Sequence, residues 1–263
     1  MKALACAALL AVSSAVSAQE VRLFAAGSLR GVMNEIGAAY AQATGVKVAG
    51  EFGPSGLLRD RLAKGETADV FASANMEHPQ ALASAGRAGP VSLFARNRLC
   101  ALAAPNAGIT TESLLDRMLD PAVKVGISTP KADPSGDYAW ALFGKADALR
   151  PGARAALESK ALQLTGGPNS PAPPRDRSVY GVLVAEGKAD VFLTYCTNAI
   201  AAQREQPGLS VVQVPAALAV GADYGLTVLQ GAAPQGAGFA QFVLSAPAQA
   251  ILSRHGFEAV KSP

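Results

Sequence analysis

The sequence predicts an α/β protein with two lobes, each a mostly parallel sheet flanked by helices. From residue 21 onward, short apolar runs typical of strands alternate with longer amphipathic stretches typical of helices. An unbroken strand-like run at 92–103 offers a path from one lobe into another, and strand and helix signals begin again at 123. A β-α-β-α-β order places parallel strands side by side under helices on both faces.

The first lobe is predicted from three strand–helix units. We expect its strands at 21–25, 46–52 and 69–73, and its helices at 29–44, at 56–64 and from 74 to about 85. Gly45 and Gly65 directly follow the first two helices, at the position where glycine favours a helix end.

The second set of units starts with a strand at 123–128. Further strands are expected at 190–195, 210–214 and 224–229, and helices at 135–145, 150–162, 178–186, from 197 onward, at 238–245 and at 247–255. Residues 165–177 are rich in Pro and Gly and predict a loop. We expect the last elements to return to the first lobe, so that residues 19–100 and 216–263 form lobe 1 and residues 101–215 form lobe 2.

The first 18 residues have the parts of a secretory signal peptide. Lys2 gives a positive start, residues 3–12 (ALACAALLAV) form an apolar run, and residues 16–18 (VSA) give the small-x-small cleavage pattern. The apolar run is well short of the ~20 residues of a membrane span. We therefore expect export to the periplasm and a soluble mature chain of 245 residues, which is 263 minus 18.

Composition and charge exclude several classes of protein. A chain that is 50% hydrophobic and only 16% charged can bury a core, and a formal charge of +3 is too small to favour nucleic acid. Cys100 and Cys196 remain after cleavage, and in an oxidising compartment such a pair predicts a disulfide. Together with His78 and His255 they lack the spacing of a zinc site, so no cation site is expected.

Three places share a design that suits an anion. At residues 25–29 (AAGSL), 52–57 (FGPSGL) and 133–136 (DPSG), a strand or turn is followed by a serine where a helix begins. A helix start offers unpaired N–H groups and a partial positive charge, and glycine lets an oxyanion approach the backbone. Because serine is also a common N-cap, any one of the three could simply cap its helix.

The mature chain resembles the periplasmic molybdate-binding proteins, a family of type II solute-binding proteins. The resemblance covers nearly all of it, and residues 21–29, 52–62, 68–74 (ADVFASA) and 190–195 (DVFLTY) carry it most clearly. It implies a two-lobed fold with the ligand cleft between the lobes. It also implies a monomer without enzymatic activity or cofactor, which captures molybdate or tungstate, closes its lobes and delivers the anion to an ABC transporter permease in the inner membrane.

The family holds its oxyanion with hydroxyls and backbone amides alone. Matched by motif, the resemblance implies hydroxyl donors at Ser28, Ser55 and Tyr195, an amide at Ser135, and a further amide at Arg177 or Ser178.

Departures from the family pattern leave the anion open. The second motif is poorer in serine, the third adds the Ser135 hydroxyl, and four arginines lie in or near the ligand segments: Arg30, Arg59, Arg61 and Arg177. An arginine in the cleft would favour an oxyanion that accepts two hydrogen bonds, whereas the alternative for each is a solvated helix face. Sulfate, phosphate or a small carboxylate therefore stay open.

The cysteines match the family only in part, because a disulfide is not a general mark of it. Our hypothesis is that Cys100 and Cys196 join neighbouring strands of the second lobe and stiffen the base of Tyr195.

Two other function classes were compared with anion binding. An exported serine hydrolase would need Gly-x-Ser-x-Gly around its nucleophile, but residues 53–57 are GPSGL, and both histidines fall in ordinary helical contexts. A binding protein for an organic ligand would need a wider pocket, usually with an aromatic or charged clamp, and an aromatic content of only 6% counts against it.

Overall fold

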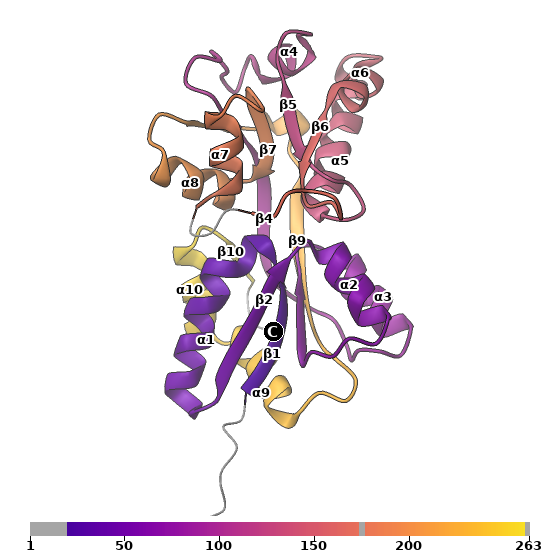
Figure 1. Cartoon of the computed structure of the whole chain (residues 1–263), viewed down its shortest axis with the longest axis vertical. Coiled ribbons are helices and arrows are strands. Elements are labelled where there is room, and N and C mark those ends of the chain that lie inside the picture. The colour runs from indigo at the N-terminus through magenta and orange to yellow at the C-terminus, as the bar shows by residue number, and fades with distance from the viewer. Residues whose placement is uncertain (1–19, 174–176, 261–263) are drawn as a thin grey trace, which may run out of the picture.

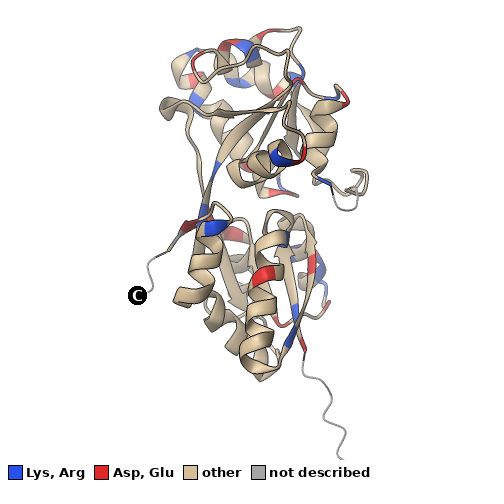
Figure 2. Cartoon of the chain, turned by 90° about the vertical axis from the view of Figure 1, so that its left-hand side faces the viewer, with Lys and Arg blue, Asp and Glu red and all other residues tan. Residues whose placement is uncertain are grey.

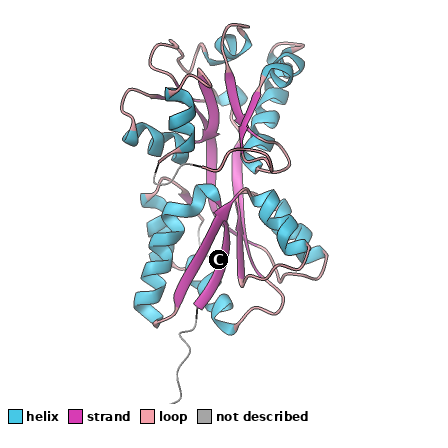
Figure 3. Cartoon of the chain, viewed as in Figure 1, coloured by secondary structure: helices cyan, strands magenta, loops and turns pink. Residues whose placement is uncertain are grey.

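A computed structural model describes residues 20–173 and 177–260 of the chain. The predicted signal peptide, residues 1–18, lies outside the described residues. The described chain forms two lobes, one above the other, each with strands flanked by helices (Figures 1 and 3). The predicted α/β class is confirmed. No helix in the described ranges is both long and apolar enough to cross a membrane.

The first lobe is built on one mixed sheet. Its strands are β1 (Glu20–Ala26), β2 (Lys47–Gly53), β3 (Val70–Ser73), the first half of β4 (Ser92–Ala103), β9 (Gly221–Val228) and β10 (Glu258–Ala259). They are flanked by η1 (Gly27–Leu29), α1 (Arg30–Thr44), α2 (Ser55–Ala63), α3 (Glu77–Ser84), α9 (Pro234–Val243) and α10 (Ala246–Arg254). The strand order is β2-β1-β3-β9-β4, with β10 paired to β4.

The second lobe repeats the layout with fewer strands. Its sheet combines the second half of β4 with β5 (Val125–Ser128), β6 (Leu162–Thr165), β7 (Val191–Tyr195) and β8 (Ser210–Gln213). Its helices are α4 (Leu114–Leu119), α5 (Pro134–Leu149), α6 (Ala153–Lys160), α7 (Val179–Ala185), α8 (Cys196–Glu205) and the short η2 (Ala216–Leu218). The order is β4-β7-β5-β6, with β8 on the other side of β4.

One strand belongs to both sheets. β4 pairs with β9 from Ser92 to Arg98, and with β7 from Leu99 onward. The chain returns beside this crossing, where the Leu99 amide donates to the Val220 carbonyl at 3.3 Å. η2, which the predicted boundary at 216 assigns to lobe 1, packs against α5 of the second lobe. The domain division stays a prediction, but the predicted strand at 92–103 matches β4 end to end.

Both sheets are mixed rather than mostly parallel. β1 pairs in parallel with β2 and β3, and β5 with β6 and β7, as the β-α-β order predicts. β4 and β9 instead pair antiparallel with their neighbours: β9 with β3 and β4, and β4 also with β7 and β8. Each lobe therefore keeps a parallel unit whose strands all end toward the other lobe (Figure 1).

Alternation of side chains along the strands divides the core into layers. On β1, Leu23 and Ala25 pack under α1, α9 and α10, whereas Phe24 packs with Leu58 and Leu82 of α2 and α3. The strands of the second lobe are likewise covered on both faces, by α5 and α6 on one and by α7 and α8 on the other. This burial on both faces explains why the strands appear in the sequence as continuous apolar runs.

Four short elements were not predicted: α4, β6, η2 and β10. The helix expected at 150–162 ends at Lys160, and Leu162 instead starts the edge strand β6. The two-residue β10 is held by pairing with Arg96 and Ala95 of β4, a contact that no local pattern encodes.

Cys100 and Cys196 form a disulfide, so the predicted pairing is present in the structure. It joins β4 to the first residue of α8 rather than two strands, because β7 ends one residue earlier, at Tyr195. Both cysteines are buried, in a cluster with Leu102 and Phe192. The bridge closes a loop of 96 residues across the base of the second lobe.

Replacing both cysteines, as Cys100→Ala with Cys196→Ala, should destabilise the protein by about 2–5 kcal/mol, since closing so long a loop restricts the unfolded chain. Urea unfolding of the mature chain, with wild type in the presence and absence of reductant as the control, measures the loss. Thiol counting on denatured, non-reduced wild type should find no free thiol; two free thiols would show that the bridge is not formed.

Candidate ligand-binding cleft

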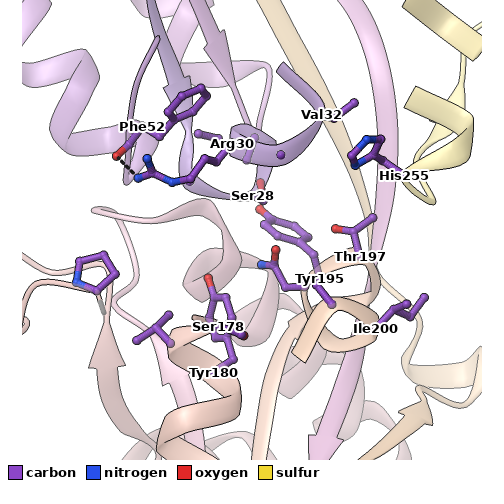
Figure 4. Close-up of a pocket in the computed structure, with 18 of the residues that line it drawn as sticks. Ser28, Arg30, Val32, Phe52, Ser178, Tyr180, Tyr195, Thr197, Ile200 and His255 are labelled. Atoms are coloured by element: carbon purple, nitrogen blue, oxygen red, sulfur yellow. Dashed lines mark hydrogen bonds between the residues drawn. The ribbon is translucent and has the colours of Figure 1, made fainter. Parts of the chain in front are cut away.

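A cleft of about 720 Å³ lies between the lobes, where the parallel strands of both sheets end (Figure 4). The first lobe lines it with the residues around η1, the start of α2 and the end of α10. The second lobe lines it with the turn before α5 and the starts of α7 and α8. Carboxyl ends of strands in open α/β sheets are the usual place for a ligand.

Ser28 lies in η1, two residues after β1 ends at Ala26, and lines the cleft. Its hydroxyl is 3.0 Å from the hydroxyl of Tyr224 on β9. Burial raises the pKa of Tyr224 far above its usual value, so this phenol stays protonated. When the Tyr224 hydroxyl donates to Ser28 Oγ, the Ser28 proton is free to point into the cleft.

Ser55 is the first residue of α2 and is 1% exposed, although it borders the cleft. Its Oγ accepts a hydrogen bond from the Ala74 amide at 3.1 Å, and among the described residues no group accepts its own hydroxyl proton. The next amide, Gly56 N–H, donates to the Ala132 carbonyl of the other lobe at 2.9 Å. A Cβ at Gly56 would lie 2.4 Å from the Lys131 carbonyl oxygen, so only glycine permits this approach of the lobes.

Tyr195 ends β7 and is 2% exposed, with its side chain bordering the cleft (Figure 4). The rings of Tyr138 and Tyr224 flank it, at centroid distances of 6.2 and 5.6 Å. Its hydroxyl is buried and has no hydrogen-bond partner among the described residues. Burial raises the pKa of Tyr195 well above its usual value, so the hydroxyl is a neutral donor at any physiological pH.

Ser135 does not border the cleft. Its amide, the predicted ligand donor, bonds instead to the carboxylate of Asp133 at 3.1 Å, because Asp133 is the N-cap of α5. The Ser135 hydroxyl is fully buried and, like that of Tyr195, has no hydrogen-bond partner in the described chain.

Arg177 and Ser178 both border the cleft, at the start of α7. The Ser178 amide donates to the Glu205 carboxylate at 2.6 Å, and the Ser178 hydroxyl caps the helix by accepting from Gly181 N at 3.3 Å. A carboxylate of the chain thus accepts from the Ser135 amide and from one of the two alternative donors at the start of α7, the Ser178 amide.

The four predicted arginines divide evenly. Arg30 and Arg177 border the cleft, and the Arg30 guanidinium lies 4.9 Å from the Phe52 ring centroid (Figure 4). Arg59 faces Asp60 and His78 instead, and Arg61 is held by Glu51 and Glu66 on the outer surface. Arg59 and Arg61 therefore fit the alternative given above, a charge on a helix face and not in the cleft.

Sequence reasoning missed several residues of the cleft: Asp133, Thr197, Asn198, Arg204, Glu205, Arg254 and His255. Thr197 and Asn198 follow the end of β7 at a helix start, which is the signal that identified the three serines, and could have been found by it. Arg254 and His255 come from the end of α10, about 220 residues from their partner Glu35 on α1. Only the fold brings them to the cleft.

The cleft is electrostatically suited to an anion. The helical segments η1, α2, α5, α7 and α8 all start there, so their positive ends converge.

No group of three or more metal-ligating side chains exists in the described chain. Charged residues of both signs are interspersed over both lobes (Figure 2).

The cleft also lacks the contacts of a serine hydrolase. The Ser28 hydroxyl bonds to Tyr224, whereas Nε2 of His255 bonds to Glu35 at 2.7 Å. No serine–histidine hydrogen bond occurs among the described residues.

Comparison with known proteins supports a binding role for the whole chain. Residues 21–258 match the family described as bacterial extracellular solute-binding proteins. A relative in Pasteurella multocida, itself uncharacterised, is 38% identical over 208 residues, which cover 78% of this chain and 86% of the relative. The molybdate-binding protein of Mycobacterium tuberculosis is 29% identical over 246 residues, covering 91% and 85%.

Solved structures show the same fold at low identity. The sulfate-binding protein of Mycobacterium tuberculosis has a TM-score of 0.77 at 19% identity and covers 92% of this chain and 88% of its own. The periplasmic molybdate-binding protein of Azotobacter vinelandii has a TM-score of 0.71 at 18% identity, covering 92% and 100%. The Campylobacter jejuni protein PEB3, solved with L-phospholactate, has a TM-score of 0.68 at 16% identity, covering 91% and 100%. The resemblance to periplasmic molybdate-binding proteins is thereby confirmed, and the chain belongs to the bacterial extracellular solute-binding proteins.

Proposed function

We propose that this protein captures a small tetrahedral oxyanion, molybdate or tungstate, outside the cytoplasm and delivers it to an ABC transporter permease. The observation that carries the proposal is the convergence of helix starts and neutral hydroxyls in one cleft. The buried Tyr195 hydroxyl is central, because it has no partner within the described protein and lies beside that cleft. An oxyanion in the cleft would supply the acceptor that this buried donor lacks.

Neutral donors suit a divalent oxyanion for a physical reason. Hydroxyl and amide protons at helix starts stabilise negative charge without a bound counter-cation, and they distinguish anions by size and geometry. Ser28, Ser55 and Tyr195 supply such hydroxyls from both lobes. The molybdate-binding relatives, which match 91% of the chain, support this choice of anion.

The physiological setting is part of the same proposal. The signal-peptide pattern of residues 1–18 and the extracellular family support a periplasmic location, and a monomer with no resident cofactor and no catalytic role fits a carrier.

A second candidate is a phosphate or an organic acid bearing a phosphate group. It is favoured by the width of the cleft, about 720 Å³, and by the exposed arginines at its rim, among them Arg30, Arg177 and Arg204. Two proteins of the same fold were solved with phospholactate and with fructose-6-phosphate. Arginine binds phosphate oxygens in a bidentate manner.

Molybdate or tungstate should raise the melting temperature of ligand-stripped protein, because binding to the native state alone stabilises it by about 2.7 kcal/mol at a hundredfold excess over Kd. Thermal-shift titration with molybdate, tungstate, sulfate, phosphate and a phosphorylated carboxylic acid ranks the anions. Ser28→Ala should abolish most of the shift. The matched control is Ser159→Ala, an exposed serine on α6, which should keep it.

The same titration decides between the two candidates. A shift with phosphate or the phosphorylated acid, and none with molybdate or tungstate, would replace the first candidate by the second. No shift with any of the five would overturn anion capture.

Tyr195→Phe should lower the affinity for the anion about ten- to a hundredfold, which is the contribution of one hydrogen bond to a charged group. The substitution should not lower the free energy of unfolding. The hydroxyl that it removes has no partner to lose. Tyr40→Phe is the matched control, because the Tyr40 hydroxyl donates to the Gln235 carbonyl at 3.4 Å, away from the cleft. Tyr40→Phe should leave the affinity for the anion, measured by calorimetry, unchanged. Equal affinity of Tyr195→Phe and wild type would remove Tyr195 from the site.

A further inference from the structure

Asp133 places a carboxylate inside the anion cleft. It borders the cleft and caps α5, where its Oδ1 accepts from the Ser135 amide at 3.1 Å. The Asp133 side chain also lies against the Gly166 backbone, where a Cβ would come within 2.6 Å of it. The carboxylate therefore occupies the very helix start that the resemblance assigns to the bound oxyanion.

Among the described residues no cation forms an ion pair with this carboxylate. None of the ion pairs within 4.0 Å formed by the described residues includes Asp133. The titratable groups that face it are Asp137 on its own helix, Tyr180 on α7 and Tyr195 on β7. In the turn before α5, Lys131 acts on Asp137 instead.

The first lobe adds no charge at this point either. The α2 residue packed against the neighbouring Ala132 is Gly56. The arginines of the cleft are Arg30, Arg177, Arg204 and Arg254, and none of them contacts Asp133 in an ion pair. Burial raises the pKa of Asp133 to about 6, although the Ser135 amide and the Ser128 hydroxyl favour its charged form.

An oxyanion in this cleft meets a like charge. Two negative groups that share a poorly solvated site repel each other, and the system relieves the repulsion by keeping one proton between them. No described arginine forms an ion pair with Asp133, so a proton can supply the positive charge at this carboxylate.

We propose that Asp133 makes anion capture proton-linked, so that the oxyanion enters the cleft together with one proton. For an anion that carries no proton near neutral pH, such as molybdate, the proton is taken up by Asp133, which then donates its O–H to an anion oxygen. For monohydrogen phosphate or a phosphate monoester, the proton arrives on the ligand, and Asp133 accepts the hydrogen bond. The inference rests on the proposed function and assigns to Asp133 a part in selecting the anion.

Protonation has a second consequence at the same place. A neutral carboxyl is a weaker acceptor than a carboxylate, so the hydrogen bond from the Ser135 amide to Asp133 weakens on protonation.

Isothermal titration calorimetry from pH 6.0 to 8.5 tests the proposal, with molybdate as the probe and two buffers of different ionisation enthalpy. Wild-type affinity for molybdate should fall about tenfold per pH unit above the pKa of Asp133, with close to one proton taken up per anion. Asp133→Asn keeps the helix cap, since asparagine also accepts the Ser135 N–H. It should bind molybdate with little pH dependence, no proton uptake and higher affinity than wild type at pH 8.

Asp137→Asn is the matched control. Asp137 lies one turn further along α5, its carboxylate accepts from the Lys131 amide at 2.8 Å, and it does not border the cleft. This variant removes the same charge from the same helix end and should keep the proton uptake and the slope of the wild-type pH dependence, with the profile moved to lower pH because the Asp137 charge raises the pKa of Asp133. Inorganic phosphate is a second probe: at pH 8 wild type should bind it better than Asp133→Asn does.

The outcomes separate this inference from the proposed function. Tight molybdate binding by wild type with a flat pH profile and no proton uptake would overturn the role of Asp133 and leave oxyanion capture standing. Absence of binding by wild type and Asp133→Asn, for both anions at every pH, would overturn both. Proton uptake is measured on wild type itself, so the test does not depend on the folding of a variant.

Discussion

The pairing of β4 with two sheets is the constraint on which the rest of the structure depends. Its first half completes the sheet of one lobe and its second half that of the other, with the change at Leu99. Leu99 is opposite Tyr195, so β7 ends where the lobes meet. The parallel strands of both sheets must then end at the same boundary, and the helices that follow them must start there. One strand thus fixes where the positive helix ends converge.

Aromatic packing reinforces this boundary. Tyr195 contacts Tyr138 within its lobe and Tyr224 from the other, and Tyr224 continues the contact to Phe94 and Phe257. The rings bury apolar area across the junction and hold their hydroxyls at defined positions. Direct polar contacts between the lobes add to this, such as the Tyr138 hydroxyl donating to the Ala74 carbonyl at 3.3 Å.

Local patterns in the sequence predicted most of the elements and part of the cleft. Strand ends followed by small residues identified Ser28 and Ser55, and the apolar runs located β1, β4 and β7, because these signals depend on neighbouring residues. The hydrogen bond that revises the predicted role of the Ser178 amide is long-range, because its acceptor, Glu205, lies 27 residues further along the chain. Asp133 is different, since Asp-Pro at a helix start is a visible cap, yet its consequence for an anion appears only once the cleft is known.

Packing alone does not explain why residue 195 is a tyrosine. Ring contacts and the adjacent disulfide at Cys196 already fix the side chain, and phenylalanine would make the same contacts. A buried hydroxyl without a partner costs about 1–3 kcal/mol in the folded state. The same cost applies to the buried Ser135 hydroxyl, which lies beside the Asp133 cap. Two uncompensated donors near one cleft are a local conflict of the kind that proteins keep where function requires it. Under the proposed function, an oxyanion that accepts from Tyr195 would remove its part of the conflict by supplying the acceptor that the fold withholds.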